Sequence, residues 1–148
     1  MTAPTYEADF YTWTQAQAAA LWTKDWPALD LAHLAEEIES LGNEPAHAVE
    51  SHLVTVLTHL LKWCYQPERR SRGWRTHVRV GRQQIARRLR RSPGLRPSLP
   101  TFLTDAYADA RLRAVDETDL PLATFPEACP WTVDQMLDED FLPWEAQS

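Results

Sequence analysis

Apolar residues recur along most of the chain at the spacing of one face of an α-helix, and 11 prolines against four glycines separate these segments. The pattern predicts five main helices, over about residues 9–24, 30–42, 45–65, 72–91 and 97–118. Thr132 and Gln135 have the spacing of a capping box, which predicts a short further helix near residues 133–138. No segment of useful length alternates as a strand does. The expected fold class is therefore all-α, a single-domain helical bundle.

The helices expected at residues 30–42 and 45–65 differ in their apolar faces. The first has one narrow stripe that should face the core, formed by Leu31, Leu34, Ala35, Ile38 and Leu41. Gly42 should end this helix in the left-handed conformation, and Pro45 should lie in the first turn of the next. Apolar residues cover close to half of the circumference of residues 45–65, so this segment is the expected central helix of the core.

One domain over residues 1–148 is expected, with a core over about residues 6–118 and a proline-rich tail over residues 119–148. The tail contains large apolar side chains that should pack across the bundle, namely Phe125, Trp131, Met136, Leu137, Phe141 and Trp144.

Charge is distributed along the chain in blocks. The 148 residues hold 15 Lys+Arg and 21 Asp+Glu, a net charge of −6. Residues 1–68 carry −8, residues 69–96 carry +11 and residues 97–148 carry −9. Arginines supply the whole of the +11, and most lie on the helix expected at residues 72–91. A basic helix face is the electrostatic footprint of nucleic-acid binding, because guanidinium groups hold phosphates through paired hydrogen bonds.

The candidate site for an anion or nucleic acid consists of six arginines, Arg69, Arg70, Arg72, Arg75, Arg79 and Arg82. The aromatic residues Trp63, Tyr65 and Trp74 are near them in sequence and could stack on bases. A second interpretation is that the protein's own carboxylates neutralise the arginines, or that the arginines simply face solvent. Exposed ion pairs contribute only about 0–1 kcal/mol each, so either arrangement is physically reasonable.

Histidines and carboxylates offer an alternative, metal-binding interpretation. Helical bundles can place such ligands inward from facing helices, but the Glu-x-x-His pairs of di-iron carboxylate proteins are missing. His52 and His59, on the helix expected at residues 45–65, also fall at the border of the apolar side of that helix. The alternative metal set is His59, His52, His33 and Glu37. No cofactor is expected in the favoured interpretation.

Other chemistries find less support in the sequence. The four glycines are separated, so no glycine-rich phosphate loop is expected. The spacing of Cys64 and Cys129 fits neither a zinc site nor a redox motif. Two cysteines make no disulfide framework, which predicts a cytoplasmic location. No apolar run approaches the roughly 20 residues of a membrane span, so no membrane partner is expected.

Several linked motifs carry a family resemblance. They are Leu34-Ala-Glu-Glu-Ile-Glu-Ser-Leu-Gly42, His59-Leu-Leu-Lys-Trp63, Tyr65-Gln-Pro-Glu-Arg-Arg-Ser71 with Trp74, Leu120-Pro-Leu122, and Phe125-Pro-Glu-Ala-Cys-Pro-Trp131. Over about residues 6–143 the chain resembles the bacterial domain-of-unknown-function family twenty-nine, found especially in cyanobacteria and proteobacteria. The resemblance implies a small all-helical protein without an assigned activity, and it supplies no catalytic residues.

The favoured interpretation is a small, non-enzymatic, cytoplasmic bacterial binding or adaptor protein. Its arginine-rich helix would contact an anionic partner, either nucleic acid or an acidic protein surface. Two alternatives stay open: a metal-binding helical-bundle protein or enzyme, and a regulatory or antitoxin-like protein partner. The sequence does not predict the activity, the ligand or the oligomeric state.

Overall fold

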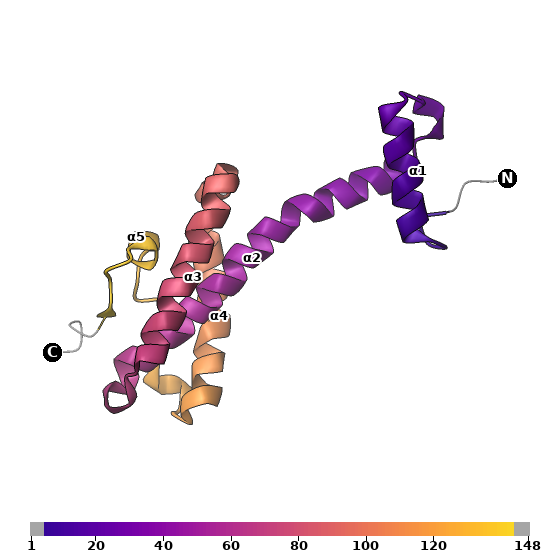
Figure 1. The fold of residues 1–148 in the computed structure, drawn as a ribbon. Coiled ribbons are helices and arrows are strands. Elements are labelled where there is room, and N and C mark those ends of the chain that lie inside the picture. Colours follow the sequence, from indigo (N-terminus) through magenta and orange to yellow (C-terminus); the bar gives the residue numbers. More distant parts are fainter. Residues whose placement is uncertain (1–4, 144–148) are drawn as a thin grey trace. The chain divides into compact units, whose positions relative to one another are not determined.

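The computed structural model describes residues 5–143, and these residues form five α-helices and no strand. The helices are α1 (Phe10–Trp22), α2 (Leu31–Tyr65), α3 (Arg72–Arg91), α4 (Leu99–Thr118) and α5 (Val133–Leu137), joined by short 3-10 helices (Figure 1). The prediction of an all-α fold is confirmed. Among the described helices, none combines the length and apolar character needed to cross a membrane.

Local capping fixes the start of α3 and of α5. The Ser71 hydroxyl accepts a hydrogen bond from the backbone N–H of Trp74, and α3 covers the residues that the sequence predicts. At α5 the capping box between Thr132 and Gln135 is complete, with each side chain accepting a hydrogen bond from the other residue's backbone N–H. Both predictions are confirmed, because capping depends on a few neighbouring residues.

The prediction of two helices over residues 30–42 and 45–65 is wrong, since these residues form the single helix α2. Gly42 does not adopt a positive φ angle, so the expected left-handed stop is absent. Pro45 lies inside the helix. A proline inside a helix loses its own backbone hydrogen bond and crowds the carbonyl four residues before it, yet the residues on both sides of Pro45 stay helical.

The chain divides into two compact units, Met1–Glu44 and Pro45–Ser148, and the boundary falls within α2. Residues 1–44, the first unit, contain one lysine and eight acidic residues, a formal charge of −7. Residues 45–148, the second unit, contain 14 basic and 13 acidic residues, a formal charge of +1. The acidity of the whole chain therefore belongs to its first 44 residues.

The first unit contains α1 and the beginning of α2. Trp13 and Ala20 of α1 are buried, but Leu31, Ile38 and Leu41 of α2 are exposed. The prediction that this apolar stripe faces a core is therefore wrong for Leu31, Ile38 and Leu41.

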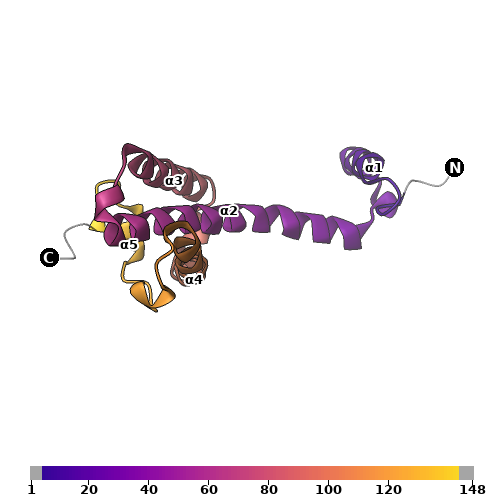
Figure 2. The same ribbon diagram turned by 90° about the horizontal axis from the view of Figure 1, so that it is seen from below.

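In the second unit, α2 lies between α3 and α4 (Figure 2). Its apolar face supplies much of the core, as predicted, with Leu57, Leu60 and Leu61 fully buried. Gly81 of α3 faces Val56 of α2, where an added Cβ atom would lie 2.6 Å from Val56 Cγ2. The absence of a side chain at Gly81 thus permits the close approach of the two helices.

The segment after α4 packs on the second unit through large apolar side chains. Phe125, Trp131 and Met136 are buried in its core. Arg111 of α4 holds the same segment by donating hydrogen bonds to the backbone carbonyls of Phe125 and Leu122. Trp144, which was expected to pack with this segment, lies outside the described residues.

Candidate anion-binding site

The exposed arginines of α3 lie mainly on one side of the helix, opposite its buried residues. We call this side the basic face; it consists of Arg72, Arg75, Arg79, Arg87 and Arg90. Arg69 before the helix and Arg91 at its end are also exposed. Within residues 45–143, no arginine nitrogen lies within 4.0 Å of a carboxylate oxygen. The basic face therefore keeps its positive charge without direct ion pairs to the described residues of its own unit.

Arg70 differs from the basic face because it is bound to a neighbouring tryptophan. Its Nε donates a hydrogen bond of 2.8 Å to the Trp63 carbonyl, and its guanidinium lies 4.9 Å from the centre of the Trp63 ring. The hydrogen bond and the cation–π contact both order the corner between α2 and α3.

The aromatic residues near the arginines also have partners inside the protein. The Lys62 ammonium lies 4.8 Å from the centre of the Trp74 ring and 3.5 Å from a Glu117 carboxylate oxygen. Tyr65 packs edge-on against Phe125. These contacts leave the aromatic side chains less available for stacking on bases than their sequence positions suggest.

Arg82 is buried, with 3% of its surface exposed, and its guanidinium binds backbone groups of the protein itself. Its guanidinium donates three hydrogen bonds to backbone carbonyls, from Nε to Met136 at 2.8 Å, from Nη1 to Phe141 at 2.9 Å and from Nη2 to Gln135 at 3.1 Å. Burial lowers the pKa of this guanidinium, while the nearby carboxylates of Asp138 and Glu139 act in the opposite direction. Arg82 therefore has a structural role within the fold, unlike the exposed arginines with which the sequence grouped it.

A groove of about 470 Å³ lies between the basic face and the segment after α5. We call it the mixed-charge groove. It is lined by Arg72, Arg75, Thr76, Val78, Arg79, Arg82, Glu139, Asp140 and Leu142. The sequence showed the acidic triplet at residues 138–140 but not its position beside the arginines, because that position depends on the contacts of Arg82 across more than 50 residues.

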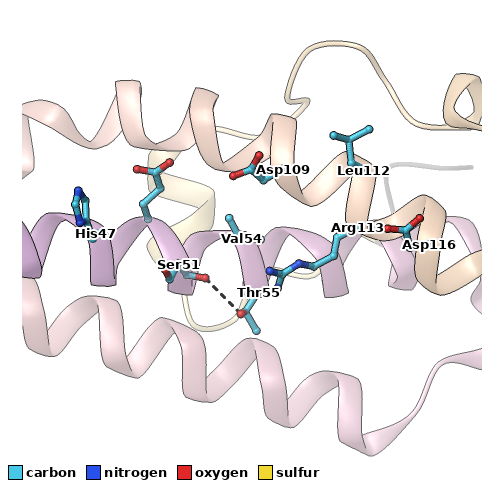
Figure 3. Close-up of a pocket in the computed structure, with 9 residues that line it drawn as sticks. His47, Ser51, Val54, Thr55, Asp109, Leu112, Arg113 and Asp116 are labelled. Carbon is cyan, nitrogen blue, oxygen red and sulfur yellow. Dashed lines mark hydrogen bonds between the residues drawn. The ribbon is translucent and has the colours of Figure 1, made fainter.

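A second groove, of about 640 Å³, lies between α2 and α4 (Figure 3). Arg113 reaches from α4 toward Thr55 on α2, and Asp109 and Asp116 flank it on α4 (Figure 3). Glu50 and His47 contribute further polar lining. The groove carries charges of both signs. It could not be predicted from the sequence, because its lining residues on α2 and α4 lie more than 50 positions apart.

His33 and Glu37, two of the alternative metal ligands, belong to a polar network within the first unit. Tyr6 stacks on His33 with ring centres 4.1 Å apart and donates a hydrogen bond to Glu37. His33 Nδ1 lies 2.7 Å from an Asp30 carboxylate oxygen, and Nε2 lies 3.3 Å from a Glu7 carboxylate oxygen. Both ring nitrogens thus face carboxylates instead of an open ligand position.

This network shifts the titration of its members. The hydrogen bond to Asp30 raises the pKa of His33, and the same bond lowers the pKa of Asp30. The hydrogen bond to Glu37 raises the pKa of Tyr6 to about 12.

His52 and His59, the other two candidate ligands, lie on α2 within the second unit. His59 Nδ1 donates a hydrogen bond of 2.8 Å to the Thr55 carbonyl, and its ring stacks on His77 of α3 with centres 4.6 Å apart. Burial lowers the pKa of both His52 and His59. Sequence reasoning did not single out His77, because its contact with His59 comes from another helix and forms only in the folded chain.

Nowhere in residues 5–143 do three or more His, Cys, Asp or Glu side chains gather in a group that could hold a metal ion. His33 and Glu37 share one network, whereas His52 and His59 each have other neighbours. Neither the His33 and Glu37 pair of the first unit nor the His52 and His59 pair of the second belongs to such a group among the described residues.

Comparison with known proteins agrees with the motif resemblance. The family model described as "Domain of unknown function DUF29" matches residues 5–142. No curated protein and no solved structure matches the chain. Because the family model covers nearly the whole sequence, the chain belongs to the family of the domain of unknown function DUF29.

Proposed function

We propose that this protein is a small, non-enzymatic binding protein of the bacterial cytoplasm that contacts the phosphates of a nucleic acid through the basic face of α3. One observation carries the proposal: the arginines of this face are exposed, and none has a carboxylate oxygen within 4.0 Å among residues 45–143. A row of uncompensated guanidinium groups repels itself and gains from a polyanion that replaces its counterions.

The distribution of charge between the units supports this proposal. The net charge of −6 suggests weak attraction to nucleic acid, but the first unit carries −7 and the second unit +1. Association depends on the local field at the binding surface more than on the total charge. That surface is part of a segment with 11 arginines and no acidic residue between positions 69 and 96.

The kind of basic residue favours phosphate as the partner group. Thirteen of the 15 basic residues are arginines. The planar guanidinium fork matches phosphate oxygens through two parallel hydrogen bonds, whereas lysine acts as a point charge. Arg72, Arg75 and Arg79 follow each other at three- and four-residue intervals along one side of α3, a linear array suited to an extended polyanion.

Binding of labelled oligonucleotides to the tag-free full chain tests the proposal. Fluorescence anisotropy with single-stranded DNA, duplex DNA and RNA should show binding at about 50 mM NaCl and a steep loss toward about 300 mM. No binding to any of the three at the lowest salt would overturn it. Capture of a polyglutamate peptide in their place would support an acidic protein surface as the partner.

Elemental analysis of the same tag-free preparation addresses the metal-binding alternative. Less than about a tenth of an equivalent of metal per chain is the result consistent with our proposal. A full equivalent of bound metal, together with a gain in thermal stability on adding that metal, would favour the alternative instead.

A further inference from the structure

The two walls of the mixed-charge groove carry opposite charges that do not pair with each other. Arg72, Arg75 and Arg79 form one wall, and Glu139 and Asp140 contribute to the other. None of these guanidinium groups lies within 4.0 Å of a carboxylate oxygen of the second unit's described residues. Open space of about 470 Å³ therefore separates groups that attract each other.

Arg82 fixes the position of the acidic wall. Its guanidinium binds the Met136 carbonyl before the turn at residues 138–140 and the Phe141 carbonyl after it. Asp138 closes the turn, because its carboxylate accepts a hydrogen bond from the Asp140 N–H and its carbonyl accepts one from the Phe141 N–H. The backbone that carries Glu139 and Asp140 is thus tied to α3 one helical turn from Arg79.

A ligand of this groove needs an anionic group for one wall and hydrogen-bond donors for the other. Val78 and Leu142 also line the groove and supply a small apolar surface. A nucleotide offers the required combination: a phosphate, a flat ring, and on some bases an exocyclic amino group. Carboxylates accept hydrogen bonds from such amino groups, as Glu and Asp do from cytosine N4.

Base pairing decides which form of nucleic acid can use both walls. In a duplex the Watson–Crick edge of each base is occupied by its partner, whereas a single strand can splay a base and present that edge to a protein. Cytosine carries an amino group on this edge, and thymine, a pyrimidine of similar size, does not.

We propose that the mixed-charge groove binds single-stranded nucleic acid and selects bases with an exocyclic amino group. The basic wall holds the phosphates, and Glu139 and Asp140 accept hydrogen bonds from the base. This inference rests on the proposed function, because it specifies which nucleic acid the basic face of α3 binds.

Two labelled strands of about 12 nucleotides, one of deoxycytidine and one of thymidine, test the selection near pH 7.5. The full-length wild-type chain should bind the deoxycytidine strand about tenfold more tightly, within the range expected for one well-placed base contact. The E139A/D140A variant, which lacks both acceptors, should bind the two strands equally. The matched control D105A/E127A removes the same charge from exposed positions outside the groove and should keep the preference. Circular dichroism of each variant checks that the fold is retained.

Equal binding of the two strands by the wild-type chain would overturn the inference. So would tighter binding of both strands by E139A/D140A with an unchanged preference, because the carboxylates would then only repel phosphate. In both cases salt-dependent binding would leave the proposed function standing. Failure of the wild-type chain to bind either strand, a duplex or RNA at about 50 mM salt would instead refute both.

Discussion

The Nε atom of Arg82 donates a hydrogen bond to the backbone carbonyl of Met136, 54 residues later in the chain. Met136 belongs to the last turn of α5, where the backbone carbonyls have no N–H donor from within the helix. An arginine in the middle of the most basic segment therefore caps another helix from the side. This contact joins α3 to α5 and places the acidic turn of residues 138–140 beside the basic face.

Replacement of Arg82 should destabilise the second unit strongly. Arg82→Lys keeps the charge, but the three carbonyls are arranged around the planar guanidinium of arginine. The single ammonium group of lysine cannot reach all three. The free energy of unfolding should fall by about 3 kcal/mol, since buried hydrogen bonds to a charged group are lost. Urea unfolding of the full chain, followed by tryptophan fluorescence, measures the change.

Arg79→Lys is the matched control, because Arg79 is an exposed residue of the same helix. It should change the free energy of unfolding by less than about 0.5 kcal/mol. Equal stability of the Arg82→Lys and Arg79→Lys variants would contradict the anchoring role of Arg82.

Gly81→Ala should weaken the packing of α3 on α2. The added Cβ atom would lie 2.6 Å from Val56 Cγ2, and overpacking of this kind outweighs the gain in helix propensity, with a net loss of about 1–2 kcal/mol. Gly73→Ala is the control, since its Cβ atom would lie at an ordinary 3.6 Å from Ser71 Oγ. Unfolding free energies that fall equally in both variants would refute the close-approach explanation.

Relief of the clash gives a second check on Gly81. In a Val56→Ala background the Gly81→Ala change should lower the free energy of unfolding less than in the wild-type chain, because the side chain at position 56 is then shorter. Strict additivity of the two changes would speak against a direct contact.

Features set by neighbouring residues could be predicted from the sequence. The start of α3 at Ser71, the capping box of Thr132 and the buried face of α2 all depend on local spacing. Pro45 and Gly42 could not be assigned in the same way. A proline or glycine permits a break in a helix, but whether the chain turns there depends on what the next residues can pack against.

The candidate site was predictable only as a charge pattern. Arg79 is exposed, whereas Arg82 is buried on the side of Val78 and Ile85, where helical spacing puts it; the sequence alone does not show which groups would bind a buried guanidinium there. The difference arises because carbonyls of residues 135–141 surround Arg82, and those contacts form only when the chain folds. The pairing of His59 with His77 has the same origin in tertiary structure.

His33 should stabilise the first unit more at low pH than at high pH. Its pKa in the folded protein is raised by the hydrogen bond to Asp30, so its contribution is complete below the unfolded value of about 6.5 and is lost as pH rises through the folded pKa. The difference in melting temperature between wild type and His33→Gln should therefore be larger at about pH 6 than at about pH 8.5. A difference that grows with pH would contradict the network.

The contribution of His59 to the stability of the second unit should depend on pH in the opposite direction. Burial lowers its pKa, and the facing groups are His77, Lys62 and, with the opposite effect, Glu117. Its contribution to stability is complete above about pH 6.5 and is lost as pH falls through the folded pKa, by up to about 1.4 kcal/mol per pH unit. NMR titration of the ring should give a midpoint below about 6.5; a midpoint above that value would refute the buried, stacked environment.

The salt dependence of nucleic-acid binding by a variant without part of the basic face tests the central claim most directly. Each phosphate contact on a single strand contributes about 0.7 to the slope of log K against log salt concentration, so R72A/R75A/R79A should lower the slope by about 2 and weaken binding at low salt. The control R113A removes an exposed arginine from α4 and should leave the slope nearly unchanged. Binding by the triple variant with the affinity and salt slope of the wild-type chain would contradict the assignment of the basic face as the phosphate-binding surface.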